Sequence, residues 1–136
     1  MRENELLRRL CDSLTESTGR EVIPETWRDG CVSVFLAGGG ERVRSYVDGG
    51  VVVALPLDIK MREVVRCEAD RLRVLDVLAE IADAAEAGIS LGTGVEYVKL
   101  SPAGSAKKVK SHENGSEEYV SPFVLEYYPE RERAAL

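Results

Sequence analysis

Histidine is almost missing from this sequence, which has a single one, His112, among 136 residues. Catalysis by a serine or cysteine triad requires a histidine base held rigidly between the nucleophile and an orienting carboxylate. His112 ends a stretch of small, polar and basic residues, 101–112, that predicts a loop or a mobile arm. Because such a loop does not hold a base rigidly, we expect no triad and no catalytic residue.

Cysteine is scarce as well, with Cys11, Cys31 and Cys67 far apart in the chain. A structural zinc site usually has four cysteine or histidine ligands, often in close Cys-x-x-Cys pairs, and the sequence has no such pair. An odd number of dispersed cysteines is typical of small buried or half-buried side chains in a reducing compartment. We therefore expect no metal site and no cofactor.

Long apolar runs are also missing. The most apolar stretch covers only residues 51–57, whereas a transmembrane helix needs about 20 apolar residues. Residues 1–9 alternate charged residues with leucine and lack the apolar stretch of a signal peptide. These absences predict a soluble protein made in the cytosol, with no membrane partner.

The chain has no excess of basic residues, because 18 lysines and arginines stand against 24 aspartates and glutamates. A protein that coats nucleic acid neutralises phosphates with a basic surface, so we expect no sequence-specific nucleic-acid partner. The rest of the composition, 44% hydrophobic and 31% charged, is that of a globular chain of one domain. We assign residues 1–128 to a single domain and residues 129–136 to a charged C-terminal tail.

Two segments have helical periodicity. Residues 3–17 repeat leucine and cysteine at three- and four-residue spacing, which gives one apolar stripe, and Gly19 supplies a stop. Residues 62–87 form the longest periodic segment, and Gly88 supplies its cap. The apolar stripe of this long helix consists of Val74, Leu78, Ile81 and Ala85.

Extended segments surround the long helix. Residues 42–47 alternate polar and apolar, which is typical of a strand buried on one side, and residues 48–50 (DGG) predict a tight turn. Residues 51–57 are nearly all apolar, as in a strand covered on both faces. Pro56 cannot donate a backbone hydrogen bond, which predicts that this strand ends or lies at an edge there. Other predicted strands cover residues 21–24, 31–36, 95–100 and 118–128.

This order of elements predicts an α+β fold. A helix is followed by three or four strands with one hairpin, a long helix and two more strands, in short α-β-β-β-α-β-β. The strand–helix alternation of doubly wound folds is missing. We therefore expect a mostly antiparallel sheet on which the N-terminal helix and the long helix pack.

Two patterns invite a chemical interpretation. Gly88-x-x-x-Gly92-x-Gly94 resembles a phosphate-binding loop, but such loops lead from a strand into a helix, and here the order is reversed. Asp76, Glu80 and Asp83 share one face of the predicted helix. A solvent-exposed outer face accounts for this grouping. They could instead hold a divalent metal if a second helix supplied partner carboxylates, so a metal-dependent hydrolase is an alternative.

Positive charge is concentrated in one region, since residues 99–112 contain four lysines and no carboxylate. The lysine cluster is typical of a solvated loop. It is also typical of a loop that contacts an acidic partner or a nucleic-acid backbone. No aromatic residue is interleaved with the lysines, so stacking on bases is not expected. The candidate partner-contact loop consists of Lys107, Lys108 and Lys110.

Several short motifs follow one another along the chain. Residues 32–40 (VSVFLAGGG) and 44–50 (RSYVDGG) form a predicted strand that leads to a Tyr-x-Asp-Gly turn, and the long helix after them carries Leu72, Leu75 and Leu78. Residues 113–115 (ENG) and 119–128 form a closing turn and a strand that contains Leu-Glu-Tyr. In their order and spacing these motifs resemble the minor-capsid and tail-terminator (tail-completion) proteins of tailed bacteriophages and prophages.

The resemblance implies a small α+β structural subunit of the phage neck or tail, made in the bacterial cytoplasm and located in the virion. Such subunits assemble with copies of themselves into a ring, commonly a hexamer, that caps the tail tube and joins it to the head connector. The partners would be tail-tube and head-connector proteins, and no catalytic residue is implied. A small bacterial adaptor or binding module is the second interpretation.

We also expect at least one sheet edge to be used between subunits, because edge strands carry unpaired backbone groups that a neighbour can satisfy. The candidate edges are residues 42–47 and the last strand.

Overall fold

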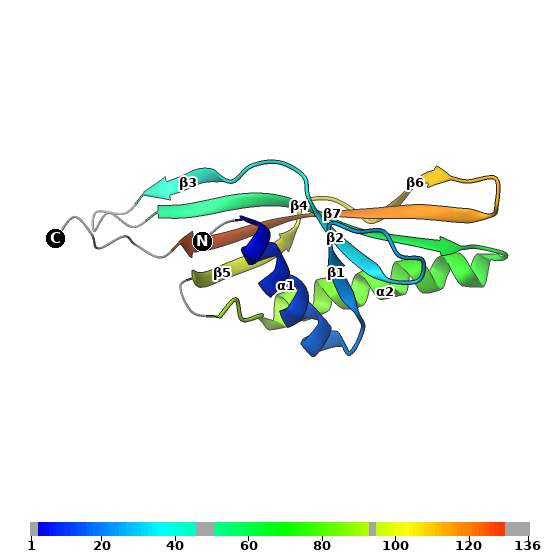
Figure 1. Cartoon of the computed structure of the whole chain (residues 1–136), viewed down its shortest axis with the longest axis horizontal. Coiled ribbons are helices and arrows are strands. Elements are labelled where there is room, and N and C mark those ends of the chain that lie inside the picture. Colours follow the sequence, from blue (N-terminus) through cyan, green and yellow to red (C-terminus); the bar gives the residue numbers. More distant parts are fainter. Residues whose placement is uncertain (1–2, 46–50, 93–94, 130–136) are drawn as a thin grey trace.

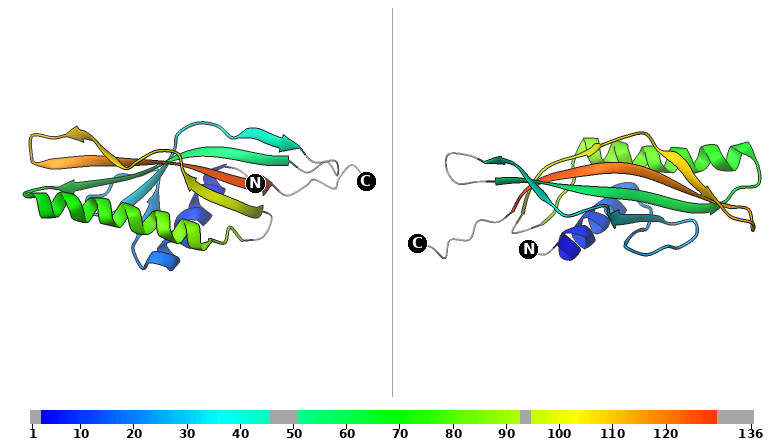
Figure 2. Two further views of the ribbon diagram at one scale, coloured as in Figure 1. Left: turned by 180° about the vertical axis from the view of Figure 1, so that it is seen from behind. Right: turned by 90° about the horizontal axis from the view of Figure 1, so that it is seen from above.

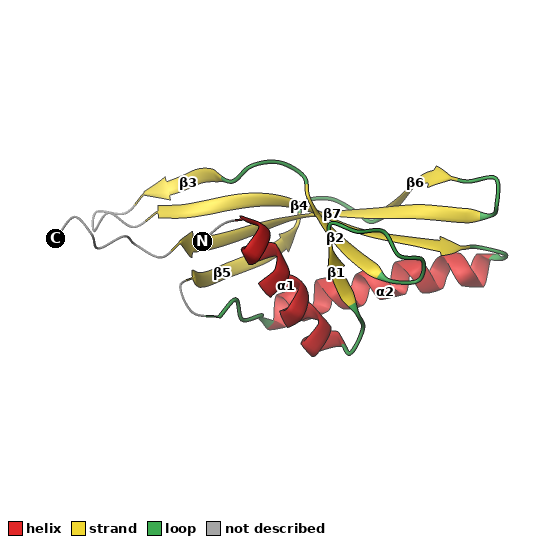
Figure 3. Cartoon of the chain, in the orientation of Figure 1, coloured by secondary structure: helices red, strands yellow, loops and turns green. Residues whose placement is uncertain are grey.

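The fold has two layers, one of helices and one of strands. The computed structural model describes residues 3–45, 51–92 and 95–129. In this part of the chain two helices pack on one face of a seven-stranded sheet, and neither covers the opposite face (Figure 1). Figure 3 separates the layers by colour, with helices red and strands yellow. The predicted α+β fold with a mostly antiparallel sheet is confirmed.

The elements follow the predicted order. From the N-terminus they are α1 (Glu3–Thr18), β1 (Val22–Pro24), β2 (Val32–Leu36), β3 (Glu41–Ser45), β4 (Val51–Val64), α2 (Glu68–Ala87), β5 (Val95–Pro102), β6 (Lys107–Ser111) and β7 (Ser116–Pro129). In the described chain three strands rather than two follow the long helix, because β6 lies where the sequence predicted a loop.

Two long strands form the centre of the sheet. β4 and β7 pair antiparallel from Val53↔Tyr127 to Val64↔Ser116. On the other side of β4, β3 pairs with its first half and β2 with its second half. On the other side of β7, β6 pairs with its first half and β5 with its second half. β1 is parallel to β2, the one parallel pair among the described strands. The sheet is therefore a long ribbon whose two ends have different edge strands (Figure 2).

α1 packs through a narrow apolar stripe, as its sequence predicts. The buried residues of this stripe are Leu6, Leu7, Leu10, Cys11 and Leu14. The helix ends where Gly19 takes a positive φ of 72° and donates its N–H to the carbonyl of Thr15. Glycine adopts this conformation without steric penalty, so the predicted stop is confirmed.

Alternation along β4 and β7 builds the other half of the core. Odd-numbered residues face the helices, and the register brings them into pairs such as Leu55↔Leu125 and Leu57↔Phe123. α2 contributes Val74, Val77, Leu78, Ile81 and Ala85. Burial of one such apolar side chain stabilises the fold by about 1.5–3 kcal/mol. Burial alternates only from Leu55 onward, whereas Val52, on the other face of β4, is buried as well and none of residues 51–57 is exposed. The predicted cover on both faces is therefore complete at Val52 and only partial from Leu55 to Leu57.

The predicted start of the long helix is also wrong. Residues 62–64 belong to β4, where they pair with β7, and α2 begins at Glu68 after the extended Cys67. Carboxylates in the first turn, Glu68 and Asp70, favour this start because they face the positive end of the helix dipole. Gly88, with a φ of 106°, caps the other end as predicted.

Pro56 neither ends β4 nor lies in an edge strand, contrary to the prediction. Its carbonyl accepts a hydrogen bond from the N–H of Ala37, on the side of β4 where β2 and β3 pair. A strand residue points its N–H and C=O to the same side, so the missing N–H of Pro56 faces the link between β2 and β3. Since this neighbouring strand is interrupted between Leu36 and Glu41, proline costs the sheet little there.

The two candidate edges have different outcomes. β7 lies inside the sheet, with β4 on one side and β5 and β6 on the other, so the prediction of a free edge at the last strand is wrong. β3 does lie at an edge, because among the described strands it pairs with β4 alone. The predicted turn at residues 48–50 lies outside the described residues, as does the predicted tail except for Pro129, which ends β7.

Candidate functional site

The lysines singled out by the sequence lie on an edge strand and not in a loop. β6 (Lys107–Ser111) pairs with the first half of β7, and all five of its residues are exposed. Neither face of β6 is buried, so its sequence carries no alternation that would mark a strand. The role of Lys107, Lys108 and Lys110 in partner contact stays a prediction.

A bulge in β6 sets the direction of these lysines. Lys107 pairs with Val120 of β7, and Lys110 pairs with Glu118, with a register shift between Lys108 and Lys110. Val120 and Glu118 are even-numbered residues of β7, on the face without helices. The bulge therefore places Lys107 and Lys110 on the same face, roughly 7 Å apart along the strand.

Glu117 ties β7 to α2 and β6 on the helical side. Its carboxylate accepts hydrogen bonds from Arg71 Nε (3.2 Å), Arg71 Nη2 (3.1 Å) and the Tyr119 hydroxyl (2.6 Å). Lys108 Nζ lies 3.7 Å from the same carboxylate. The hydrogen bonds from Arg71 and then Tyr119 are the main causes that lower the pKa of Glu117 from 4.5 to about 2. The carboxylate therefore stays charged in a largely buried position.

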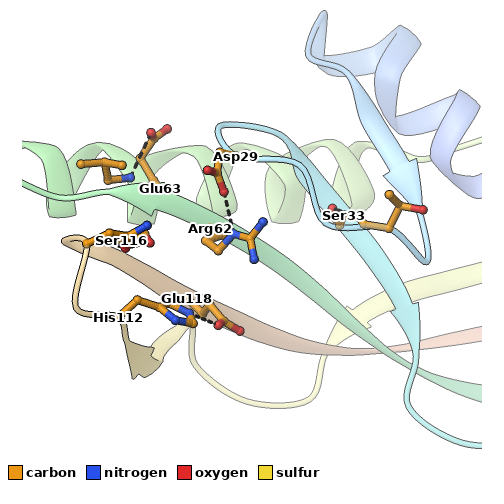
Figure 4. A network of polar contacts seen from close by, with 10 residues as sticks. Asp29, Ser33, Arg62, Glu63, His112, Ser116 and Glu118 are labelled. Carbon is orange, nitrogen blue, oxygen red and sulfur yellow. Dashed lines mark hydrogen bonds and ion pairs between the residues drawn. The ribbon is translucent and has the colours of Figure 1, made fainter.

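A row of charged side chains crosses the opposite face of the sheet (Figure 4). Arg62 on β4 donates a hydrogen bond of 2.6 Å to Asp29, which precedes β2. Glu118, the partner of Arg62 in the β4–β7 register, contacts Nε2 of His112 just after β6. The histidine of this chain is therefore engaged with a carboxylate of the adjacent strand, at the sheet surface.

An aromatic pair packs beside this row. The ring centroids of Trp27 and Phe35 are 5.4 Å apart. Lys60 Nζ lies 4.7 Å from the Phe35 centroid, and the Arg62 guanidinium lies 5.3 Å from that of Trp27. Cations over ring faces stabilise such clusters by about 0.5–1 kcal/mol each at exposed sites. The cluster fixes the segment before β2 against the sheet.

Sequence reasoning missed both clusters. The available signal for the first was Glu117 itself, a carboxylate two residues from Tyr119 in a strand whose odd-numbered residues face the core. A buried carboxylate needs a partner, and Arg71 lies 46 residues away. The second cluster had a weaker signal, because the position of Trp27 depends on the path of the segment before β2.

Asp76, Glu80 and Asp83 lie on the exposed side of α2, as a solvated face predicts. Glu80 accepts a hydrogen bond of 2.6 Å from Arg20 Nε, which lowers its pKa. Within the described ranges, no group of three or more histidine, cysteine, aspartate or glutamate side chains is placed to hold a metal ion. The geometry therefore lends no support to the alternative of a metal-dependent hydrolase.

The glycine-rich segment after α2 leads from a helix into a strand, with Gly94 outside the described residues. Gly88 and Gly92 also flank Ser90 in a Gly-x-Ser-x-Gly pattern, which in hydrolases lies on a turn from a strand into a helix. Here the N–H of Ser90 donates instead to Oγ of Ser13 on α1, at 3.1 Å. The order of elements favours neither a phosphate-binding loop nor a nucleophile turn.

The three cysteines are free thiols in different environments. Cys11 is part of the core, and burial raises the pKa of its thiol to about 12. Cys31 is half-buried, also as predicted. Cys67 is exposed just before α2, so for this residue the prediction of a buried or half-buried side chain is wrong.

Neither described helix has both the length and the apolar character needed to cross a membrane.

The chain was compared with protein-family models, curated sequences and solved structures, and the solved structures give a similarity. No protein-family model matches the chain, and no curated protein sequence matches it. Among solved structures, it is similar to a chain of the "Virion of native gene transfer agent (GTA) particle", with a TM-score of 0.58 and 16% sequence identity. The match covers 90% of this chain and 91% of that chain. At this identity the similarity establishes the shared fold.

Proposed function

We propose that this chain is a structural protein of a phage or phage-like particle, of the tail-terminator type, and not an enzyme. The observation that carries the proposal is the fold similarity to a virion chain, which spans nearly the whole length of both molecules. The sequence motifs at residues 32–50 and 113–128 support the same class of protein on separate grounds. In this proposal the chain forms a ring, as a hexamer, that caps the tail tube and contacts the head connector.

The edges of the sheet suit assembly with other subunits. Among the described strands, β1, β3, β5 and β6 each pair on one side only. On the outer side of β1 the Thr15 hydroxyl already bonds the N–H and C=O of Val22. The outer sides of β3, β5 and β6 are the ones whose backbone N–H and C=O groups a neighbouring subunit can satisfy. A ring needs a head-to-tail interface that closes by rotation, and about 1,600 Å² of buried surface suffices for a stable specific contact.

The charged side chains also favour a structural role. Glu117 contacts Arg71 and Tyr119, and Glu80 contacts Arg20, so these carboxylates join one element to another. A catalytic carboxylate would instead lie in a cleft with its pKa shifted toward the operating pH. The pKa of Glu117 moves in the opposite direction, to about 2.

The proposal is tested in the particles themselves. Deletion of the gene from the phage or prophage should give tails of uncontrolled length and heads without joined tails, as seen by electron microscopy. A plasmid copy of the gene should restore normal particles. Mass spectrometry of purified wild-type particles should detect the chain. Normal particles from the deletion strain would contradict the proposal.

The ring is tested separately with the purified chain. Negative-stain electron microscopy should show closed rings, and light scattering should give the mass of a small whole number of copies. A chain that stays monomeric both alone and on tail tubes would contradict the ring, while its presence in particles would still support a virion role.

A further inference from the structure

We propose that β6 of one copy docks head to tail on the exposed face of α2 of the next copy. The inference rests on the proposed function, because it specifies the contact that joins neighbouring subunits of the ring. We call residues 107–111 the β6 edge. The α2 stripe consists of Glu68, Leu72, Asp76, Ala79 and Asp83.

Two exposed apolar side chains mark these surfaces. In the described chain, Leu72 and Val109 are the large hydrophobic residues that are exposed, at 53% and 50%. Leu72 lies in the α2 stripe, and Val109 lies in the β6 edge. A specific interface commonly has an apolar centre with a polar rim, and each of these residues has charged neighbours that can form such a rim.

The β6 edge is basic and has a free side. All five of its residues are exposed, Lys107 and Lys110 lie on the face without helices, and Val109 stands at the bulge between Lys108 and Lys110. β6 pairs only with β7 among the described strands. The β6 edge therefore presents lysines and one exposed apolar side chain together.

The α2 stripe is acidic. Its residues recur at three- and four-residue spacing and are all exposed, so they lie along one side of the helix. Alanine and leucine alternate with carboxylates there. One exposed residue of α2 is basic, Arg73, and Asp70 on the same helix pairs with it. The stripe thus complements the β6 edge in charge.

The positions of the two surfaces suit a closed ring. Arg71 at the start of α2 and Lys108 of β6 both contact Glu117, so the β6 edge and the start of the α2 stripe lie at the same end of the molecule. β6 runs along the edge of the sheet there, and α2 lies in the helical layer (Figures 1 and 2). Surfaces at one height along the long axis can meet by rotation about a parallel axis, without the shift that would make a filament.

Charge also selects this contact over a two-fold one. If two copies joined through β6 alone, the lysines of one strand would face those of the other, and like charges directly opposite are destabilising. Lysines on an edge strand can equally serve only to prevent edge-to-edge pairing. A head-to-tail contact and a purely protective role predict different results in the following experiments.

Cross-linking tests the contact itself. In a full-length background with Cys31→Ser and Cys67→Ser, one variant carries Leu72→Cys and another carries Val109→Cys. Equal mixtures treated with a short bis-thiol cross-linker should give a covalent dimer, and either variant alone should give at least tenfold less. A chain with both changes should give a ladder of multimers that ends at the ring size. A dimer from Val109→Cys alone, or no dimer from the mixture, would overturn the proposal.

Charge-reversal variants test whether the β6–α2 contact rests on attraction between opposite charges. The pair Lys107→Glu and Lys110→Glu should weaken self-association roughly tenfold or more, and so should Glu68→Lys with Asp76→Lys. Mixing the two variants should restore association, because every contact in an alternating ring then joins opposite charges. Circular dichroism checks that each variant is folded. Unchanged association in both variants, or no recovery on mixing, would overturn the proposal.

The two proposals fail in distinguishable ways. If the chain is needed for normal tails but the mixed cysteine variants do not cross-link, the β6–α2 contact is wrong and the proposed function stands. If normal particles form without the chain while the cross-link appears, the contact stands and the proposed function is wrong.

Discussion

The two faces of the β4–β7 ribbon are covered very differently. On the helical face, Leu57 and Phe123 pair across the strands, and each is 1% exposed. Neither described helix covers the other face (Figure 1), and Pro56, Pro122 and Val124 on that face are half-buried. The same two strands build both faces, so the difference arises from side-chain alternation.

This difference separates folding from surface interaction. The helical face holds the core cluster that joins both helices to the sheet. The other face holds the charged row and the cations over Trp27 and Phe35, contacts that contribute about 1 kcal/mol or less each when exposed. We therefore expect substitutions on the helical face to cost far more stability than substitutions of similar size on the other face.

The largest effect is expected for Leu57→Ala. Leu57 is buried among both layers, so its truncation removes apolar contacts and leaves a cavity, at a cost of about 3 kcal/mol. Urea denaturation followed by circular dichroism measures this loss. The matched control is Val124→Ala on the other face of the paired strand, which should cost about 1 kcal/mol or less. Equal losses for the two variants would show that both faces are covered in solution.

Sequence patterns predicted the helical face well because burial there imposes a period on the residues. The stripe of α1 and the stripe of α2 both follow from helical spacing, and both face the sheet. β6 has no buried face and no period, so its composition predicted a loop. Its pairing with β7 depends on the turn at residues 112–115 and on the free side of β7, neither of which is visible in the strand's own residues.

Long-range contacts were equally beyond sequence reasoning. Pro56 was expected to end a strand, yet it is tolerated because β2 and β3 leave a gap beside it. Of the candidate site, sequence composition identified the lysines and the acidic face of α2. That the lysines lie beside the start of α2 follows from Arg71, Glu117 and Lys108, which are separated by 46 and 9 residues along the chain.

A second prediction concerns the close approach of the β2–β3 link to β4. A Cβ added at Gly40 would lie 2.7 Å from Val53 Cγ1, closer than such atoms pack, and Val53 packs against the core. We expect Gly40→Ala to destabilise the fold by about 2 kcal/mol, because β4 or the link must shift. Gly39→Ala is the control, since a Cβ there meets nothing within 4 Å, and thermal denaturation compares the two. A neutral Gly40→Ala would mean that the link is held away from β4.

A smaller and pH-dependent effect is expected for Glu117→Gln. The pKa of Glu117 is lowered to about 2 in the folded chain, against 4.5 for an ordinary glutamate, so its charged form stabilises the fold. This contribution is complete above pH 4.5 and is lost as the pH falls toward 2. Glu117→Gln should cost about 1 kcal/mol at pH 7, where it leaves Arg71 without its carboxylate.

Urea denaturation of both chains between pH 7 and pH 2.5 measures the difference in stability. The difference in the free energy of unfolding between wild type and Glu117→Gln should become smaller as the pH falls through this range. Glu118→Gln, on the face without helices, controls for the general effect of removing a carboxylate from β7. A gap that widens on acidification would contradict the role assigned to Glu117.

The smallest effect is expected for Lys60→Ala. Lys60 lies over the rings of Phe35 and Trp27, and a partly exposed cation–π contact contributes about 0.5–1 kcal/mol. Lys60→Arg should retain most of this stability, because a guanidinium can also lie over a ring face. Unfolding followed by the fluorescence of Trp27, the single tryptophan, reports on this cluster directly. If Lys60→Ala costs as much as Leu57→Ala, the face without helices is as much a part of the core as the helical face. The contrast between the two faces then disappears, because both would be required for folding.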